Sequence, residues 1–249
     1  MTSRSAEVLV HATAEEVADA LTARLLARLA EIQRDFRVPQ VGLTGGRIAT
    51  RAYEQLAKKG PRSAVDWSRV ELWWGDERFV PADDDDRNDK PTLDLLAAPL
   101  RLNPERIHRM PASDGGSDLD SAAEAYAAEL GSTVLDICLL GLGPDGHVAS
   151  IFPEHPSSYA DGDVIAVRSS PKPPPDRISL TLPVINRSRE VWFLVSGSDK
   201  AAAAKMALLG AGPMQVPGAG VSGVDRTLWL MDTDAAAQLP PDLTQRGRI

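Results

Sequence analysis

Residues 135–153 read LDICLLGLGPDGHVASIFP, and this stretch decides the fold class of the 249-residue chain. An almost wholly apolar run ends in a glycine-rich turn that holds one aspartate, Asp145, and one histidine, His147. A short continuous apolar run that stops at glycines is typical of a strand buried on both faces of a sheet. The stretch therefore predicts a central strand that delivers two neighbouring polar residues to one edge of a sheet.

Strand-like and helix-like segments alternate along nearly the whole chain. The segments that read as strands are 38–46, 69–77, 107–110, 135–141, 163–169, 189–197 and 226–232, and those that read as helices are 15–32, 47–59, 88–100, 118–130 and 199–210. Thr13 and Glu16 fit a capping box at the start of the first helix. Apolar strands separated by helices predict an α/β fold with a Rossmann-like, mostly parallel sheet and helices on both faces. Since no internal repeat or linker interrupts the pattern, we expect a single domain over residues 1–249.

Composition narrows the class of partner. The formal net charge of -8 argues against a nucleic-acid surface, which needs clustered lysine and arginine. The one cysteine, Cys138, cannot form a disulfide within the chain, and this fits the reducing cytoplasm. The first residues do not resemble a signal peptide, and no apolar run is long enough to cross a bilayer. We therefore expect a cytoplasmic protein that binds neither nucleic acid nor membrane.

Unusual polar residues follow four of the predicted strands. These strand ends read TGG (44–46), GDER (75–78), GLGPDGH (141–147) and SGSDK (196–200). Ligands of such sheets bind beyond the carboxyl ends of the strands, where the loops converge. The first motif joins a strand to a helix through Gly45 and Gly46, so it fits either an anion site at the helix N-terminus or a tight turn without a ligand.

Two cations stand at these strand ends. Ser198 reads as an N-cap, which places Lys200 in the first helical turn. A lysine there opposes the helix dipole at a cost of roughly 0.3–1 kcal/mol, and a bound anion would reverse the sign. Arg78 fits either a loop ion pair with its acidic neighbours or a fork to phosphate or carboxylate oxygens. The four aspartates at 83–86 read as a solvated loop rather than a metal site.

The pair Asp145 and His147 is the candidate catalytic centre. A nearby carboxylate can orient an imidazole and stabilise its protonated form. The other three histidines, His11, His108 and His155, have no comparable setting. The chain has no G-x-S-x-G elbow and no HExxH motif, and the spacing of its glycines does not form a dinucleotide fingerprint. Serine hydrolase, zinc protease and dinucleotide-binding functions are thus without support.

The combination GLGPDGHVASIFP, WGDERFVP, LTGG, RISLTLPVINRSREVWFLVSG and SDKA, taken together, resembles the 6-phosphogluconolactonase family of the glucosamine-6-phosphate isomerase/lactonase superfamily. The resemblance runs from about Val41 to Asp232. It implies hydrolysis of a small-molecule sugar-phosphate lactone, 6-phospho-D-glucono-1,5-lactone, to 6-phosphogluconate in the oxidative pentose phosphate pathway. It also implies a cytoplasmic enzyme without a redox cofactor, and we expect no cofactor, no metal and a monomer.

The resemblance assigns roles to particular residues. His147 matches the base that activates water, and Asp145 stands beside it. The positions that match contacts to the sugar phosphate are Thr44, Gly45, Gly46, Arg78, Arg177 and Lys200. Relatives usually carry a small residue after the Gly-Gly pair, whereas this chain has Arg47, which fits either an extra phosphate contact or a side chain in solvent.

Two other functions compete with lactone hydrolysis. Glucosamine-6-phosphate deaminases resemble DGHIAFNEP after the strand, with a glutamate five residues beyond the histidine, where this chain has Phe152. Glu154 stands two positions too late to match. A non-catalytic sugar-phosphate sensor would normally carry an attached DNA-binding segment. The residues before Val41 are too few and too acidic for one.

Overall fold

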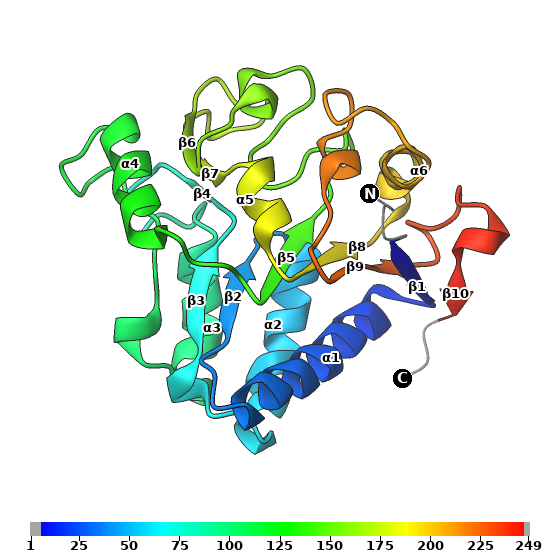
Figure 1. The fold of residues 1–249 in the computed structure, drawn as a ribbon, viewed down its shortest axis with the longest axis horizontal. Coiled ribbons are helices and arrows are strands. Elements are labelled where there is room, and N and C mark those ends of the chain that lie inside the picture. Colours follow the sequence, from blue (N-terminus) through cyan, green and yellow to red (C-terminus); the bar gives the residue numbers. More distant parts are fainter. Residues whose placement is uncertain (1–5, 247–249) are drawn as a thin grey trace.

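The computed structural model describes residues 6–246 and contains two β-sheets (Figure 1). The larger sheet has seven strands, all paired in parallel, in the order β10-β1-β9-β8-β5-β2-β3. These strands are β1 (Glu7–His11), β2 (Gln40–Leu43), β3 (Glu71–Trp74), β5 (Ile137–Gly141), β8 (Glu190–Val195), β9 (Arg226–Asp232) and β10 (Gln245–Arg246). The predicted α/β fold with a mostly parallel sheet is confirmed.

Helices cover both faces of this sheet (Figure 1). One face carries α1 (Ala14–Arg34), α2 (Arg47–Lys59) and α3 (Asp89–Leu100), and the other carries α4 (Leu119–Leu130), α5 (Leu182–Arg187) and α6 (Ala201–Leu208). Alternate residues of a strand point to opposite faces, so each central strand supplies both cores. In β5, for example, Ile137 and Leu139 pack with the first group of helices, and Cys138 and Leu140 pack with the second. Burial on both sides explains the unbroken apolar run in the sequence.

The first helix begins as its sequence predicts. The Thr13 side chain accepts a hydrogen bond from the backbone N–H of Glu16 at 3.2 Å. The Glu16 carboxylate in turn accepts from the N–H of Ala12 at 2.9 Å, one residue before the cap. These bonds satisfy backbone donors that have no partner inside the helix, and they fix its start at Ala14.

The second sheet was not predicted. It has three antiparallel strands in the order β4-β7-β6, namely β4 (Asp76–Arg78), β7 (Arg177–Leu180) and β6 (Val164–Val167). The strand expected at 163–169 thus exists but lies outside the parallel sheet, and the charged residues 76–78 form a strand rather than a loop. The register of β4 and β7 sets Arg78 opposite Arg177, which brings residues 99 positions apart together.

Two further expectations need correction or completion. The strand predicted at 107–110 is wrong, because only an isolated bridge joins Ile107 to Leu72 there. Strand β1 was missed, since a five-residue segment at the N-terminus has little pattern of its own until β9 and β10 pair with its two edges.

The short 3-10 helices of the described residues are η1 (Gly60–Arg62), η2 (Trp67–Arg69), η3 (Pro104–Arg106), η4 (Pro156–Tyr159), η5 (Ser198–Lys200), η6 (Pro217–Gly220) and η7 (Pro241–Leu243).

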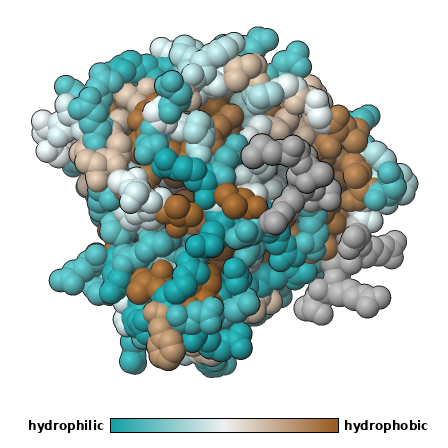
Figure 2. Space-filling view, viewed as in Figure 1, coloured by the Kyte–Doolittle hydropathy of each residue, from teal (hydrophilic) through white to brown (hydrophobic). Residues whose placement is uncertain are grey.

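The surface in Figure 2 is mostly hydrophilic, with hydrophobic side chains in scattered groups. Phe36 is the most exposed of the large hydrophobic residues in the part of the chain that the structure describes, with 88% of its surface accessible. Over those same residues, no helix combines the length and the apolar character that crossing a membrane would require.

Candidate active site

A cavity of about 620 Å³ opens at the carboxyl ends of the parallel strands. Its walls are the loops after β2, β5 and β8, joined by β4, by Asn88, by the proline-rich loop 171–175 and by β7. Seven of the eight predicted site residues line it: Thr44, Gly45, Gly46, Arg78, His147, Arg177 and Lys200. The eighth, Asp145, contacts the His147 ring. The structure therefore brings together all the residues that the sequence singled out.

The turn after β5 holds Asp145 and His147 in contact. Two backbone hydrogen bonds close this turn, from Gly146 N–H to Gly143 O and from Gly143 N–H to His147 O, each at 2.9 Å. Gly146 has a φ of 85°, a conformation that glycine adopts without strain. The Oδ1 atom of Asp145 lies 2.5 Å from Nδ1 of His147. Since an ionised carboxylate can only accept, Nδ1 carries the proton and Nε2 is left with a free lone pair.

The charge state of Asp145 follows from its neighbours. Burial alone would raise the pKa of its carboxyl group. The hydrogen bond and charge of His147, together with the charge of Lys172, outweigh burial and hold the Asp145 pKa well below its ordinary value. The carboxylate is therefore ionised at neutral pH and can orient the imidazole.

Gly143 makes this pairing possible. A Cβ atom on Gly143 would lie 1.9 Å from Nδ1 of His147 and 2.4 Å from Oδ1 of Asp145, far inside van der Waals contact. A glycine in such a turn can also let a ligand approach the backbone. At Gly143 the protein's own catalytic pair fills that space, whereas at Gly141 a Cβ would meet nothing within 4 Å, and the residue lines the cavity.

Phe152 forms a wall behind the histidine. Its ring centroid lies 4.9 Å from that of His147, and the guanidinium carbon of Arg177 lies 5.8 Å from the centre of the Phe152 ring. Phe152 is 1% exposed, so the position at which a deaminase would carry glutamate is a packed apolar position here. Among the described residues, those that line the cavity do not include Glu154.

Positive charge gathers around the cavity of a protein whose net charge is negative. Arg78 and Arg177 face each other across β4 and β7, and like charges in such a pair repel. Burial lowers the pKa of the Arg177 guanidinium, the Asp76 carboxylate opposes this, and the charge of Arg78 adds to it. An anion bound between the two side chains would relieve the repulsion.

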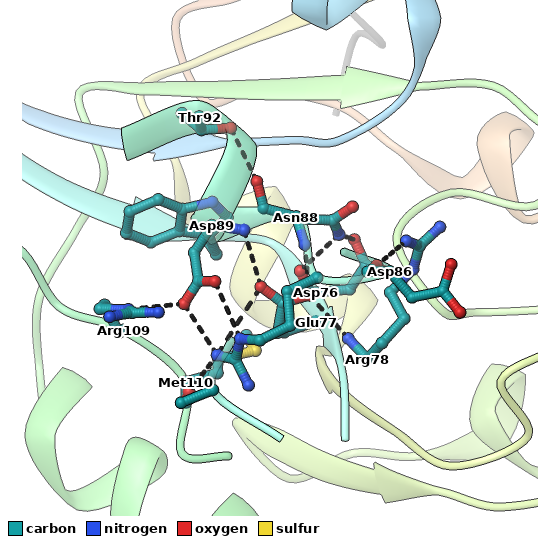
Figure 3. A network of polar contacts seen from close by, with 12 residues as sticks. Asp76, Glu77, Arg78, Asp86, Asn88, Asp89, Thr92, Arg109 and Met110 are labelled. Atoms are coloured by element: carbon teal, nitrogen blue, oxygen red, sulfur yellow. Dashed lines mark hydrogen bonds and ion pairs between the residues drawn. The ribbon is translucent and has the colours of Figure 1, made fainter. Parts of the chain in front are cut away.

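A buried polar network supports strand β4 (Figure 3). Glu77 accepts hydrogen bonds from the backbone N–H groups of Arg78, Asn88 and Asp89 at 2.7–2.9 Å. Burial and the nearby Asp89 carboxylate raise the pKa of Glu77 to about 7. The Asn88 amide donates to the carbonyl of Asp76 at 3.0 Å and presses against Gly45, where a Cβ would lie 1.9 Å from the amide oxygen. Gly45 is thus required for packing whether or not an anion is bound.

The loop after β8 differs from its expected form. Ser198 is not an N-cap, because Gly197, with a φ of 101°, precedes the 3-10 helix η5 and Lys200 ends it. Lys200 still reaches the cavity, with its Nζ 3.3 Å from the Asp199 carboxylate. Arg47 is the first residue of α2 and also lines the cavity, in support of the phosphate-contact alternative.

The cavity residues that were not picked out from the sequence include Asp76, Asn88 and Lys172. Asp76 stood inside the motif 75–78 but was treated only as an ion-pair partner, and in the structure it accepts a hydrogen bond from the Ser150 hydroxyl at 2.7 Å. Lys172 lies inside the proline-rich segment 171–175, which is none of the four strand-end motifs. Within residues 6–246, no group of three or more histidine, cysteine, aspartate or glutamate side chains could hold a metal ion.

Comparison with known proteins places this geometry in a family. Residues 12–229 match the family model described as glucosamine-6-phosphate isomerases/6-phosphogluconolactonase. The chain is 48% identical over 254 residues to a 6-phosphogluconolactonase of Streptomyces coelicolor, covering 97% of each chain. It is 43% identical to a 6-phosphogluconolactonase of Mycobacterium tuberculosis, covering 94% of this chain and 95% of the relative.

Solved structures agree with the sequence relatives. The 6-phosphogluconolactonase of Thermotoga maritima superposes with a TM-score of 0.80 at 27% identity, covering 91% of this chain and all of that one. A monomeric glucosamine-6-phosphate deaminase gives a TM-score of 0.79 at 21% identity and covers 93% and 99% of the two chains, which shows a shared fold alone. The chain belongs to the glucosamine-6-phosphate isomerase/6-phosphogluconolactonase family.

Proposed function

We propose that this protein hydrolyses 6-phospho-D-glucono-1,5-lactone to 6-phosphogluconate, a step of the oxidative pentose phosphate pathway, with His147 as the general base. The observation that carries the proposal is the Asp145–His147 pair, with Oδ1 and Nδ1 2.5 Å apart, inside a cavity ringed by cations. The 6-phosphogluconolactonases that resemble the chain over almost its whole length support the substrate.

The phosphate of the substrate would bind at the cationic side of the cavity. Thr44, Gly45 and Gly46 lead into the N-terminus of α2, where free N–H groups and the helix dipole favour an anion. Arg78 and Lys200 would supply charged hydrogen bonds. The Nε and Nη2 atoms of Arg177 donate hydrogen bonds to the carbonyls of loop 171–175, so Arg177 would contact the phosphate through Nη1.

The chemical step needs one base and one water. A δ-lactone is an activated ester, so general-base catalysis worth about 10²–10⁴-fold makes a useful contribution. Nε2 of His147 would take a proton from water as the water oxygen attacks the lactone carbonyl carbon. Asp145 would stabilise the imidazolium that forms, and this imidazolium would return the proton to the ring oxygen as the C1–O bond breaks. No covalent intermediate with the protein is required.

The chain is also proposed to act as a single domain and a monomer in the cytoplasm, without metal or redox cofactor and without nucleic-acid or membrane partners. The support is the composition, a length close to that of the S. coelicolor relative, and a site made of acid–base and cationic side chains.

A two-substrate assay tests the proposal against its nearest rival. We expect the purified protein to form 6-phosphogluconate from the lactone and to release no ammonia from glucosamine 6-phosphate. The reason is chemical, because isomerising an amino sugar needs acid–base groups beyond one histidine, and Phe152 occupies the position of the missing carboxylate. Ammonia release without lactone turnover would replace the proposal with a deaminase, and the absence of both activities would favour a sensor.

A further inference from the structure

A lysine outside the predicted site residues stands against the catalytic pair. The Nζ atom of Lys172 lies 3.4 Å from Nδ1 of His147 and 3.8 Å from Oδ1 of Asp145. Both Nζ and the protonated Nδ1 are donors, so the 3.4 Å contact is one of charge against a polar N–H rather than a hydrogen bond. A cation at this distance disfavours a second positive charge on the imidazole.

The fold holds this lysine in place through its backbone. Arg177, itself 5% exposed, donates from Nη2 to the carbonyls of Lys172 and Pro173 at 3.0 and 3.2 Å, and from Nε to the carbonyl of Pro174 at 3.1 Å. The Ser170 hydroxyl donates to the Lys172 carbonyl at 2.9 Å. Four hydrogen bonds to three consecutive carbonyls fix the backbone of the loop, and the Lys172 side chain extends from this backbone to the histidine.

The charges near His147 and Lys172 come from several elements. Asp145 lies on the same turn as His147, Lys172 comes from loop 171–175, and Arg177 lies on β7 across the Phe152 ring, while Lys200 and Asp199 of η5 act on Lys172. Burial lowers the pKa of Lys172, the Asp145 charge opposes this, and the charges of Lys200 and Arg177 add to it. Asp145 favours the imidazolium, and Lys172 is the cation in contact with the ring that opposes it.

We propose that Lys172 is a positioning residue that acts through the Asp145–His147 pair: its ammonium group weakens proton uptake at His147 and so keeps the base available at neutral pH. The inference rests on the proposed lactone hydrolysis. Asp145 alone would orient the ring but would also make the imidazole readier to hold a proton. Lys172 opposes the positive charge on the ring but leaves the hydrogen bond from the ring to Asp145 in place. The ring is therefore still oriented by Asp145, while the imidazolium is stabilised less.

The test compares Lys172→Met, Lys172→Arg and wild type by the pH dependence of kcat/KM for the lactone. In Lys172→Met the acidic limb should move to higher pH by about half to one unit, so that activity at pH 6 relative to pH 8 falls about 3- to 10-fold. Lys172→Arg keeps the charge and should restore the wild-type limb. Lys205→Met, at an exposed position of α6 outside the cavity, serves as the control for loss of a lysine.

A second readout needs no turnover. The ring proton resonance of His147 in the free protein, identified by its absence in His147→Gln, should titrate at higher pH in Lys172→Met than in wild type. A wild type without lactonase activity would end the proposed function, yet this titration would still decide the role of Lys172. Coincident His147 titrations in Lys172→Met and wild type, or an activity loss by one factor at every pH, would overturn the inference.

Discussion

Replacing His147 by alanine should lower kcat/KM for 6-phosphogluconolactone by about 10²–10⁴-fold, the range that general-base catalysis contributes. The side chain lies in the turn after β5, outside the two hydrophobic cores, and is 18% exposed, so its removal should leave the fold intact. The measurement is initial-rate formation of 6-phosphogluconate, with the spontaneous hydrolysis of the lactone subtracted at each substrate concentration.

A second variant, at Asp145, tests whether the carboxylate orients the imidazole. Asp145→Asn keeps the size of the side chain but can present a donor to Nδ1, which would place the imidazole proton on the wrong nitrogen. Its activity should lie between those of wild type and His147→Ala, while calorimetry should show 6-phosphogluconate bound with near wild-type affinity by both variants. Turnover by His147→Ala close to that of wild type would remove His147 from the mechanism.

Gly143→Ala should abolish activity almost as completely as His147→Ala, although it touches no group that reacts. Its methyl group would overlap the His147 ring and the Asp145 carboxylate at 1.9 and 2.4 Å, so the pair would have to leave its position. The overlap involves only side chains of a partly exposed turn, so the molecule should still fold. We expect a loss of at least about 10²-fold in kcat, in line with a misplaced base.

A matched glycine controls for the substitution itself. Gly162 is exposed, lies outside the cavity and has nothing within 4 Å of an added Cβ, so Gly162→Ala should keep wild-type activity. Thermal unfolding of both variants, followed by circular dichroism, separates a displaced pair from an unfolded protein. If Gly143→Ala were folded and within about twofold of wild-type turnover, the turn geometry described here would not matter for catalysis.

The parallel sheet could be read from the sequence because its strands are buried on both faces. The apolar runs that became β2, β3, β5, β8 and β9 are visible without any tertiary information. Helix α1 was equally clear, since the Thr13–Glu16 capping pattern is local and its bonds form as expected.

The second sheet could not be read in the same way. Residues 76–78 are all charged, and they become strand β4 only because β7, about 100 residues later, pairs with them and the Glu77 carboxylate is satisfied by backbone donors from residues 78, 88 and 89. The predicted strand at 107–110 failed because only Ile107 of this tetrapeptide bridges to the sheet edge, at Leu72.

The part of the site that could be predicted consists of charged and acid–base residues in the strand-end motifs. The Asp145–His147 pair and Lys200 follow the parallel strands β5 and β8, so parallel topology was enough to bring them to one cavity, which Arg78 enters from strand β4. Lys172 was missed because it arrives on a proline-rich loop whose path depends on hydrogen bonds from Arg177. The role of Gly143 could not be predicted, because only the structure shows that the histidine ring fills the space beside it.

The most direct test of a phosphate-anchored lactonase compares two lactones on wild-type protein, 6-phosphogluconolactone and unphosphorylated gluconolactone, at pH 7 with spontaneous hydrolysis subtracted. Two charged hydrogen bonds to the phosphate, from Arg78 and Lys200, contribute about 1.5–3 kcal/mol each, so kcat/KM should be about 10²–10⁴-fold higher for the phosphorylated lactone. Equal values for the two substrates, or no turnover above the spontaneous rate, would contradict both the anion site and the proposed reaction.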